Sequence, residues 1–140
     1  MATYHLSIVT PEETVFDQEI VSLIVPGVKG YLGVLAHHAP LITPLQPGKI
    51  TIRLPDESEL ILAVAGGFLE VANNKATILA DAAEPADQID RDRAAQALER
   101  ARRRLTDHSA HWDVDRANAA LHRALNRIRV AESLATAGQS

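Results

Sequence analysis

The spacing of apolar residues changes once along the chain, and this change constrains the possible folds more than any other feature. Between Tyr4 and Ala80 apolar residues recur at every second position, as in Lys49–Leu54 and Glu59–Val64. This alternation is typical of strands with one buried face. From Asp87 onward the apolar residues follow the i, i+3, i+4, i+7 spacing of amphipathic helices. The sequence therefore predicts a strand-rich part followed by a helical part.

Turn-forming residues divide the first part into many short segments. Short strands separated by frequent turns are typical of an antiparallel sandwich or a flattened barrel. The glycines at 27, 30 and 33 are expected in tight turns, and Gly48-Lys49 is followed by Ile50 rather than the Ser or Thr of a phosphate loop. The turn signals are Thr10-Pro11, Pro26-Gly27, Pro47-Gly48, Pro55-Asp56, Gly66-Gly67 and Asn73-Asn74.

Two helices are expected in the second part, with Asp90 and Asp113 as N-caps. A short polar segment, Thr106–Trp112, turns one helix back against the other. We therefore expect an α+β protein: residues 1–84 form an antiparallel β-sandwich or flattened barrel, and residues 85–140 form an antiparallel α-helical hairpin. The apolar stripes are Ala94, Ala97, Leu98, Ala101 and Leu105 in the first helix, and Val114, Ala117, Leu121, Ala124, Leu125 and Ile128 in the second.

Composition excludes several classes of function. The chain has no cysteine, which rules out disulfides and thiolate metal sites. No apolar run approaches the ~20 residues needed to span a bilayer, so we expect no direct membrane insertion. The net charge is −4, with four Lys/Arg against ten Asp/Glu in residues 1–84 and ten arginines against eight Asp/Glu in residues 85–140. An acidic chain with five aromatic residues argues against a nucleic-acid partner.

Catalytic groups are not evident in the sequence. It contains no metal-coordinating phosphate loop, no Ser-His-Asp set and no paired-carboxylate cleft. His37 and His38 are adjacent and point in different directions on a strand, while His108 and His111 lie in a predicted turn without a third ligand. We expect a non-catalytic protein with no metal site and no obligatory cofactor.

The arginines of the second part permit two interpretations. Arg93 and Arg100 lie seven residues apart and share a helix face, as do Arg123 and Arg127, which lie four apart. In an antiparallel hairpin these four guanidinium groups would converge on one anion, and a triphosphate would suit them. Arginines on an amphipathic helix also commonly form a solvated face with acidic partners. The residues alone leave both interpretations open.

The alanine stripes also permit two interpretations. A buried methyl group contributes about 0.8 kcal/mol and a buried leucine about 1.5–3 kcal/mol. After the entropy cost of ordering, we therefore expect the net free energy of docking the hairpin to be only a few kcal/mol. Such a hairpin can detach as a unit, since alanine-rich helices keep their helical propensity. Small residues can equally serve close packing in a static structure.

The string Pro26–Leu41, followed by Leu45–Gly48, resembles the amino-terminal domain of the epsilon subunit of rotary F-type ATP synthases. The resemblance extends nearly end to end, from Tyr4 to Glu132. It implies a non-catalytic subunit of the central stalk that couples the gamma subunit to the membrane c-ring of a proton-translocating enzyme. It also implies a peripheral position at the cytoplasmic face of the plasma membrane. In that family the hairpin either folds against the β domain or extends into the catalytic head, where it blocks ATP hydrolysis.

Within the hairpin, Ile89-Asp90-x-x-Arg93-Ala94 resembles the nucleotide-binding motif of ATP-binding epsilon subunits. The resemblance implies ATP as a regulatory ligand rather than a substrate. Carried over position by position, it implies that Glu84, Ile89, Asp90 and Ala94 hold the adenosine end and that Arg93, Arg100, Arg123 and Arg127 hold the phosphates.

The resemblance further implies that segments around Lys29–Leu32 and His38–Leu41 meet the c-ring and that another face of the sandwich binds gamma. Arginines of the extended helices would meet the alpha and beta subunits. The alternative is a free-standing ATP-sensing module, which would not co-purify with gamma and the catalytic head. The arginines implied in contacts with alpha and beta are Arg102, Arg103, Arg104, Arg116 and Arg123.

Overall fold

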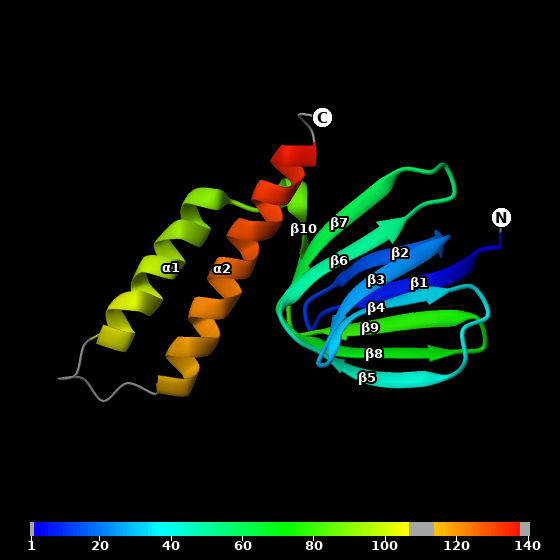
Figure 1. The fold of residues 1–140 in the computed structure, drawn as a ribbon, viewed down its shortest axis with the longest axis horizontal. Coiled ribbons are helices and arrows are strands. Elements are labelled where there is room, and N and C mark those ends of the chain that lie inside the picture. Colours follow the sequence, from blue (N-terminus) through cyan, green and yellow to red (C-terminus); the bar gives the residue numbers. More distant parts are fainter. Residues whose placement is uncertain (1, 107–113, 138–140) are drawn as a thin grey trace. The chain divides into compact units, whose positions relative to one another are not determined.

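A computed structural model describes residues 2–106 and 114–137 of the chain. The chain divides into two compact units, Met1–Pro85 and Ala86–Ser140 (Figure 1). The first unit consists of strands, and the second consists of helices. The change in periodicity near Asp87 therefore coincides with the change from strand to helix.

The strands of the first unit are short, as the frequent turn signals predict. They are β1 (Tyr4–Val9), β2 (Thr14–Ile20), β3 (Ser22–Gly27), β4 (Gly30–Leu35), β5 (Leu41–Leu45), β6 (Gly48–Arg53), β7 (Glu59–Val64), β8 (Gly67–Ala72), β9 (Lys75–Ala80) and β10 (Ala83–Pro85). The second unit contains η1 (Ala86–Gln88), α1 (Arg91–Thr106) and α2 (Val114–Ala137).

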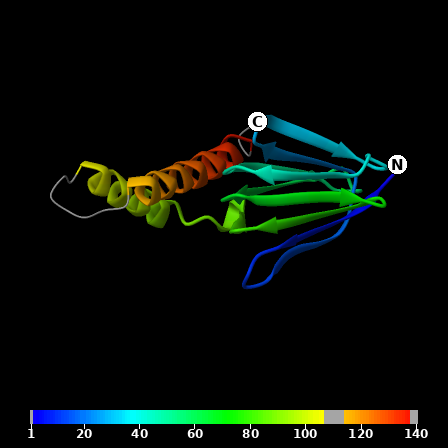
Figure 2. The same cartoon turned by 90° about the horizontal axis from the view of Figure 1, so that it is seen from below.

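The strands form one curved sheet in the order β10-β7-β6-β3-β5-β8-β9-β1-β2, and β4 pairs with β3 beside this path. The sheet folds over itself into two layers (Figures 1 and 2). The predicted β-sandwich followed by a helical hairpin is confirmed. One pair departs from the antiparallel pattern: β1 runs parallel to β9, with Leu6 beside Ala76. These strands are far apart in sequence, so no tight hairpin turn forces them to be antiparallel.

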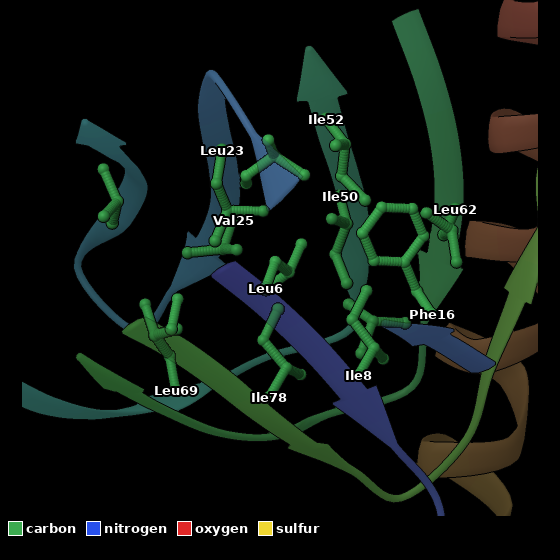
Figure 3. Close-up of a cluster of buried hydrophobic side chains, with 14 of the residues drawn as sticks. Leu6, Ile8, Phe16, Leu23, Val25, Ile50, Ile52, Leu62, Leu69 and Ile78 are labelled. Atoms are coloured by element: carbon green, nitrogen blue, oxygen red, sulfur yellow. The ribbon is translucent and has the colours of Figure 1, made fainter. Parts of the chain in front are cut away.

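The core of the sandwich comes from the inward-facing residues of the alternating strands. Most of these side chains are fully buried, and Figure 3 shows several of them converging between the layers. Tyr4 is buried among them and donates a 2.6 Å hydrogen bond from its hydroxyl to the Val34 carbonyl. Burial raises the pKa of the Tyr4 phenol, so it stays a donor. The largest fully buried side chains of this core are Tyr4, Leu6, Ile8, Ile20, Leu23, Ile50, Ile52, Leu62, Leu69 and Ile78.

The start of β8 depends on a glycine. Gly67 has φ +140°, and a Cβ atom there would lie 2.2 Å from the Leu79 carbonyl oxygen of β9. Gly67 pairs with Ala80 on β9 and with Leu45 on β5, so three strands meet at this residue. The close approach of these strands therefore requires a residue without a side chain.

In the helical unit, the two helices lie side by side and run in opposite directions (Figure 2). The Arg93 amide donates to Asp90 Oδ1 at 3.0 Å, which confirms Asp90 as the N-cap of α1. Both alanine stripes are also confirmed: Ala94 and Ala101 of α1 and Ala117 and Ala124 of α2 are buried. The second N-cap, Asp113, and the turn residues His108, His111 and Trp112 lie outside the described residues. No helix in the described part of the chain has the length and hydropathy needed to span a membrane.

Replacing Gly67 with alanine is expected to destabilise the sandwich by about 2 kcal/mol or more, because the new Cβ clashes with backbone and the φ angle is strained. Gly33→Ala is the matched control. A Cβ at Gly33 meets nothing within 4 Å and its φ lies outside the left-handed region. Its stability should be unchanged or higher by up to about 1 kcal/mol. Urea unfolding of both variants measures the difference, and equal midpoints would show that β8 and β9 can shift to accept a side chain.

Candidate functional site

The predicted phosphate-binding arginines lie along one side of the hairpin. Each residue of an α-helix is rotated by about 100° from the one before it. Arg93 and Arg100 each precede a buried alanine of α1 by one residue, and Arg123 stands in the same relation to Ala124 of α2. Because the two helices are antiparallel, residues that precede the buried alanines by one position lie on the same side of the hairpin in both helices. Arg127, one turn after Arg123, continues the row. We call this set, Arg93, Arg100, Arg123 and Arg127, the arginine side.

The level of these residues along the hairpin follows from an ion pair between the helices. Arg91, the first residue of α1, lies with its Nη2 3.6 Å from Glu132 Oε1 of α2. Arg100 lies nine residues after Arg91 in α1, and Arg123 lies nine residues before Glu132 in α2. Arg100 and Arg123 therefore lie at about the same level, opposite each other. Arg93, Arg100 and Arg123 are exposed and Arg127 is half-buried, so an anion in solution can reach them.

The motif residues at the start of α1 have different environments. Ile89 is buried and Asp90 is exposed, with its carboxylate already accepting the Arg93 amide. Ala94 is fully buried on the stripe that faces α2, so its methyl group has no surface open to a ligand in this arrangement. Asp90 also holds the Ala94 amide, through its backbone carbonyl at 3.0 Å. Asp90 therefore fixes the first turn of α1, from which the Arg93 side chain projects.

Glu84, the remaining member of the predicted set, lies in the other unit. It is half-buried in β10, where it pairs with Ala63 of β7. The other seven predicted residues all belong to the helical unit. The structure thus brings together the residues from Ile89 onward within one unit and places Glu84 at the end of the sheet.

Metal-ligating side chains do not cluster in the described ranges, 2–106 and 114–137: no three His, Asp or Glu side chains are arranged to hold an ion. One histidine contacts two carboxylates across β1 and β2. There His5 Nε2 bonds Asp17 Oδ1, and His5 Nδ1 lies 3.6 Å from Glu19 Oε1. These cross-strand contacts join the first two strands at the surface.

The outer face of the sandwich carries an exposed apolar row that runs across three strands. Pro44 of β5 pairs with Phe68 of β8, and Phe68 pairs with Leu79 of β9. Phe68 and Leu79 are 54% and 55% exposed, and the neighbouring Ile42 is 73% exposed. We call Ile42, Pro44, Phe68 and Leu79 the outer apolar row. Contiguous apolar surface of this kind marks an interaction site more often than single exposed residues do.

A second exposed apolar group belongs to the β3–β4 hairpin. Val28 at the turn and Tyr31 on β4 are 55% and 60% exposed, and the Tyr31 hydroxyl accepts the Lys49 amide at 3.1 Å. Of the two segments implied in c-ring contact, Lys29–Leu32 covers the turn into β4 and the first half of that strand, and His38–Leu41 follows the end of β4 at Leu35.

Sequence reasoning missed both the ion pair and the outer apolar row. The alternation of inward-facing and outward-facing residues along the strands did contain the signal for the outer apolar row. Phe68 and Leu79 each neighbour a buried core residue, Leu69 and Ile78, so they must point to the opposite face. Nothing local identifies the partner of Arg91, because Glu132 belongs to the other helix.

Comparisons with known proteins place both units in one family. The family model described as "ATP synthase, Delta/Epsilon chain, beta-sandwich domain" matches residues 3–86. The model described as "ATP synthase, Delta/Epsilon chain, long alpha-helix domain" matches residues 87–132.

Curated relatives cover nearly the whole chain. The ATP synthase epsilon chain of Moorella thermoacetica is 50% identical over 134 residues, which is 96% of this chain and 100% of the relative. The ATP synthase epsilon chain of Desulforamulus reducens is 49% identical over 131 residues, 93% of this chain and 98% of the relative.

A similar fold occurs in solved structures. A chain in the Euglena gracilis mitochondrial ATP synthase has a TM-score of 0.78 at 23% identity, covering 90% of this chain and 79% of that one. A chain in the central stalk and c-ring structure of the Tetrahymena thermophila mitochondrial ATP synthase has a TM-score of 0.57 at 14% identity, with 93% and 94% covered. The match of both family models and the near-full-length identity show that the chain belongs to the ATP synthase delta/epsilon family, among the epsilon chains, which are subunits of the central stalk.

Proposed function

We propose that the sandwich couples the gamma subunit to the c-ring and that the hairpin restrains ATP hydrolysis when it extends. The observation that carries this proposal is the division into two units with separate packing. The core of the sandwich consists entirely of residues from the first unit, whereas the hairpin packs through its own alanine stripes. A subunit of this design can keep one part docked while the other part moves. Its place is peripheral, at the cytoplasmic face of the membrane that holds the c-ring.

The outer apolar row supports docking to gamma. Two large apolar side chains, Phe68 and Leu79, remain exposed on a sheet whose inner face is fully packed. Burying each of them in an interface contributes about 1.5–3 kcal/mol. The unit around them is acidic, with four Lys/Arg against ten Asp/Glu in residues 1–84, and Glu70 lies beside Ile42 on the same face. This surface suits an apolar patch with a basic rim on gamma. The β3–β4 turn with Val28 and Lys29 is then the candidate c-ring contact.

The arginine side supports ATP as a regulatory ligand of the folded hairpin. Two exposed arginines of α1, together with one exposed and one half-buried arginine of α2, offer several bidentate forks to one triphosphate. A ligand at about a hundred times its dissociation constant stabilises the state it binds by about 2.7 kcal/mol. This is comparable to the few kcal/mol expected from the alanine stripes. ATP therefore favours the folded hairpin over the extended one.

Removing the hairpin tests the division of roles. We expect the fragment 1–85 to unfold cooperatively, to bind gamma as the full chain does, and to leave the assembled enzyme with faster ATP hydrolysis. The reason is that the core of the sandwich needs no residue beyond β10, while the extended helices are the inhibitory element. Thermal melts, pull-down on gamma and steady-state hydrolysis measure the three properties. An unfolded fragment would contradict independent packing, and unchanged hydrolysis at low and high ATP would contradict inhibition.

Charged substitutions in the outer apolar row test the gamma contact. We expect Phe68→Asp or Leu79→Asp to weaken pull-down on gamma at least tenfold, since each places a charge in a desolvated interface. Leu35→Asp is the matched control, because Leu35 is 64% exposed on β4, outside the row. Thermal melts verify that all three variants fold. If Leu35→Asp disrupts binding and the row variants do not, gamma binds the β3–β4 surface instead.

Alanine substitutions on the arginine side test nucleotide binding. We expect Arg93→Ala or Arg123→Ala to weaken ATP binding to the isolated chain by tenfold or more, since a charged hydrogen bond contributes roughly 1.5–3 kcal/mol. Arg102→Ala is the control: Arg102 follows Ala101 by one residue, so it lies on the other side of the hairpin. Isothermal titration calorimetry measures the affinities. An absence of heat with millimolar ATP, or equal affinities in all four proteins, would leave the arginines as a solvated face.

A further inference from the structure

The ion pair between Arg91 and Glu132 joins the two helices at the end of the hairpin where their outer termini lie. Arg91 is the first residue of α1, and Glu132 lies in the second-to-last turn of α2. Their side chains are separated by 3.6 Å and are 56% and 57% exposed. The contact therefore bridges the two helices where they would begin to separate. The turn at the other end already ties them together covalently.

The charge of Arg91 has a sign that its own helix disfavours. The amino end of a helix carries partial positive charge, and Arg91 is a cation at the first residue of α1. The dipole of α1 therefore gives no reason for an arginine at this position. The contact with Glu132 of α2 does give one, since the carboxylate offsets the cost of the cation.

The rest of the helix interface is weak enough for this pair to matter. Most of the buried side chains of α1 and α2 are alanines, such as Ala94, Ala101, Ala117 and Ala124, and Val130 is the larger exception. On the arginine side, Arg100 and Arg123 lie at the same level and repel each other when no anion is bound. Arg91 follows Asp90 at the start of the helix and lies on the other side of the stripe from Arg93. The attraction of the ion pair therefore acts on the side opposite the repulsion.

We propose that Arg91 and Glu132 form a clasp that controls the separation of α1 from α2. When the clasp opens, Arg91 loses the carboxylate of Glu132 and is left at a helix end that disfavours a cation, and this biases the equilibrium toward the closed hairpin. The physiological meaning of the clasp rests on the proposed inhibitory role of the extended helices. Its existence does not depend on ATP binding or on any partner subunit.

The absence of cysteine allows the separation to be measured in the full chain with two introduced labels. Gln96 of α1 and His122 of α2 are exposed positions outside the clasp and the arginine side. Spin labels at Gln96→Cys and His122→Cys, read by pulsed dipolar spectroscopy without ATP, report the ratio of open to closed hairpins. We expect Arg91→Gln or Glu132→Gln to raise this ratio, by up to about five-fold for an exposed pair.

Two further variants make the test specific. The double reversal Arg91→Glu/Glu132→Arg keeps the clasp and places an acid at the amino end of α1, which favours it, so its hairpin should be at least as closed as the parent. Glu99→Gln is the matched control, since it removes the ion pair of Glu99 with Arg103, 3.4 Å apart within α1, and should leave the ratio unchanged. Single variants that match the parent, or a double reversal as open as the singles, would overturn the clasp. Failure of ATP binding or of inhibition would not, because neither enters this measurement.

Discussion

The architecture depends on the burial of the inner faces of two sheet layers against each other. Leu6, Ile8, Leu23, Ile50 and Ile78 are fully buried in the sandwich, and each belongs to a strand whose alternate residues face outward. Because this core is complete within the first unit, the helices need not contribute to it. The outer face of the sandwich is left without a role in this core, and the helices form a compact unit of their own.

The helical unit depends less on apolar burial. Most of its buried side chains are alanines, so charged groups have a larger influence on whether the helices stay together. Arg100 and Arg123 lie at the same level on one side, and Arg91 contacts Glu132 on the other. The proposed nucleotide site and the proposed clasp therefore use separate residues of the same hairpin.

The two proposed roles are separated along the chain in the same way. The exposed apolar side chains Phe68 and Leu79, the proposed gamma contact, belong to the sandwich. The charged side chains that would respond to ligands belong to the hairpin. Membership in the epsilon chains of ATP synthase gives both parts a common setting. It does not assign the ligand or the regulatory contacts, which depend on individual residues.

The sequence by itself determined the elements, because period, turn residues and caps act between near neighbours. It predicted the sandwich, the hairpin, the alanine stripes and the N-cap Asp90, all of which the structure contains. The tertiary structure alone decided the parallel pairing of β1 with β9, the alignment of Pro44, Phe68 and Leu79 across three strands, and the contact of Arg91 with Glu132. These relations join residues distant in sequence, and their formation depends on how the elements pack, which no local pattern encodes.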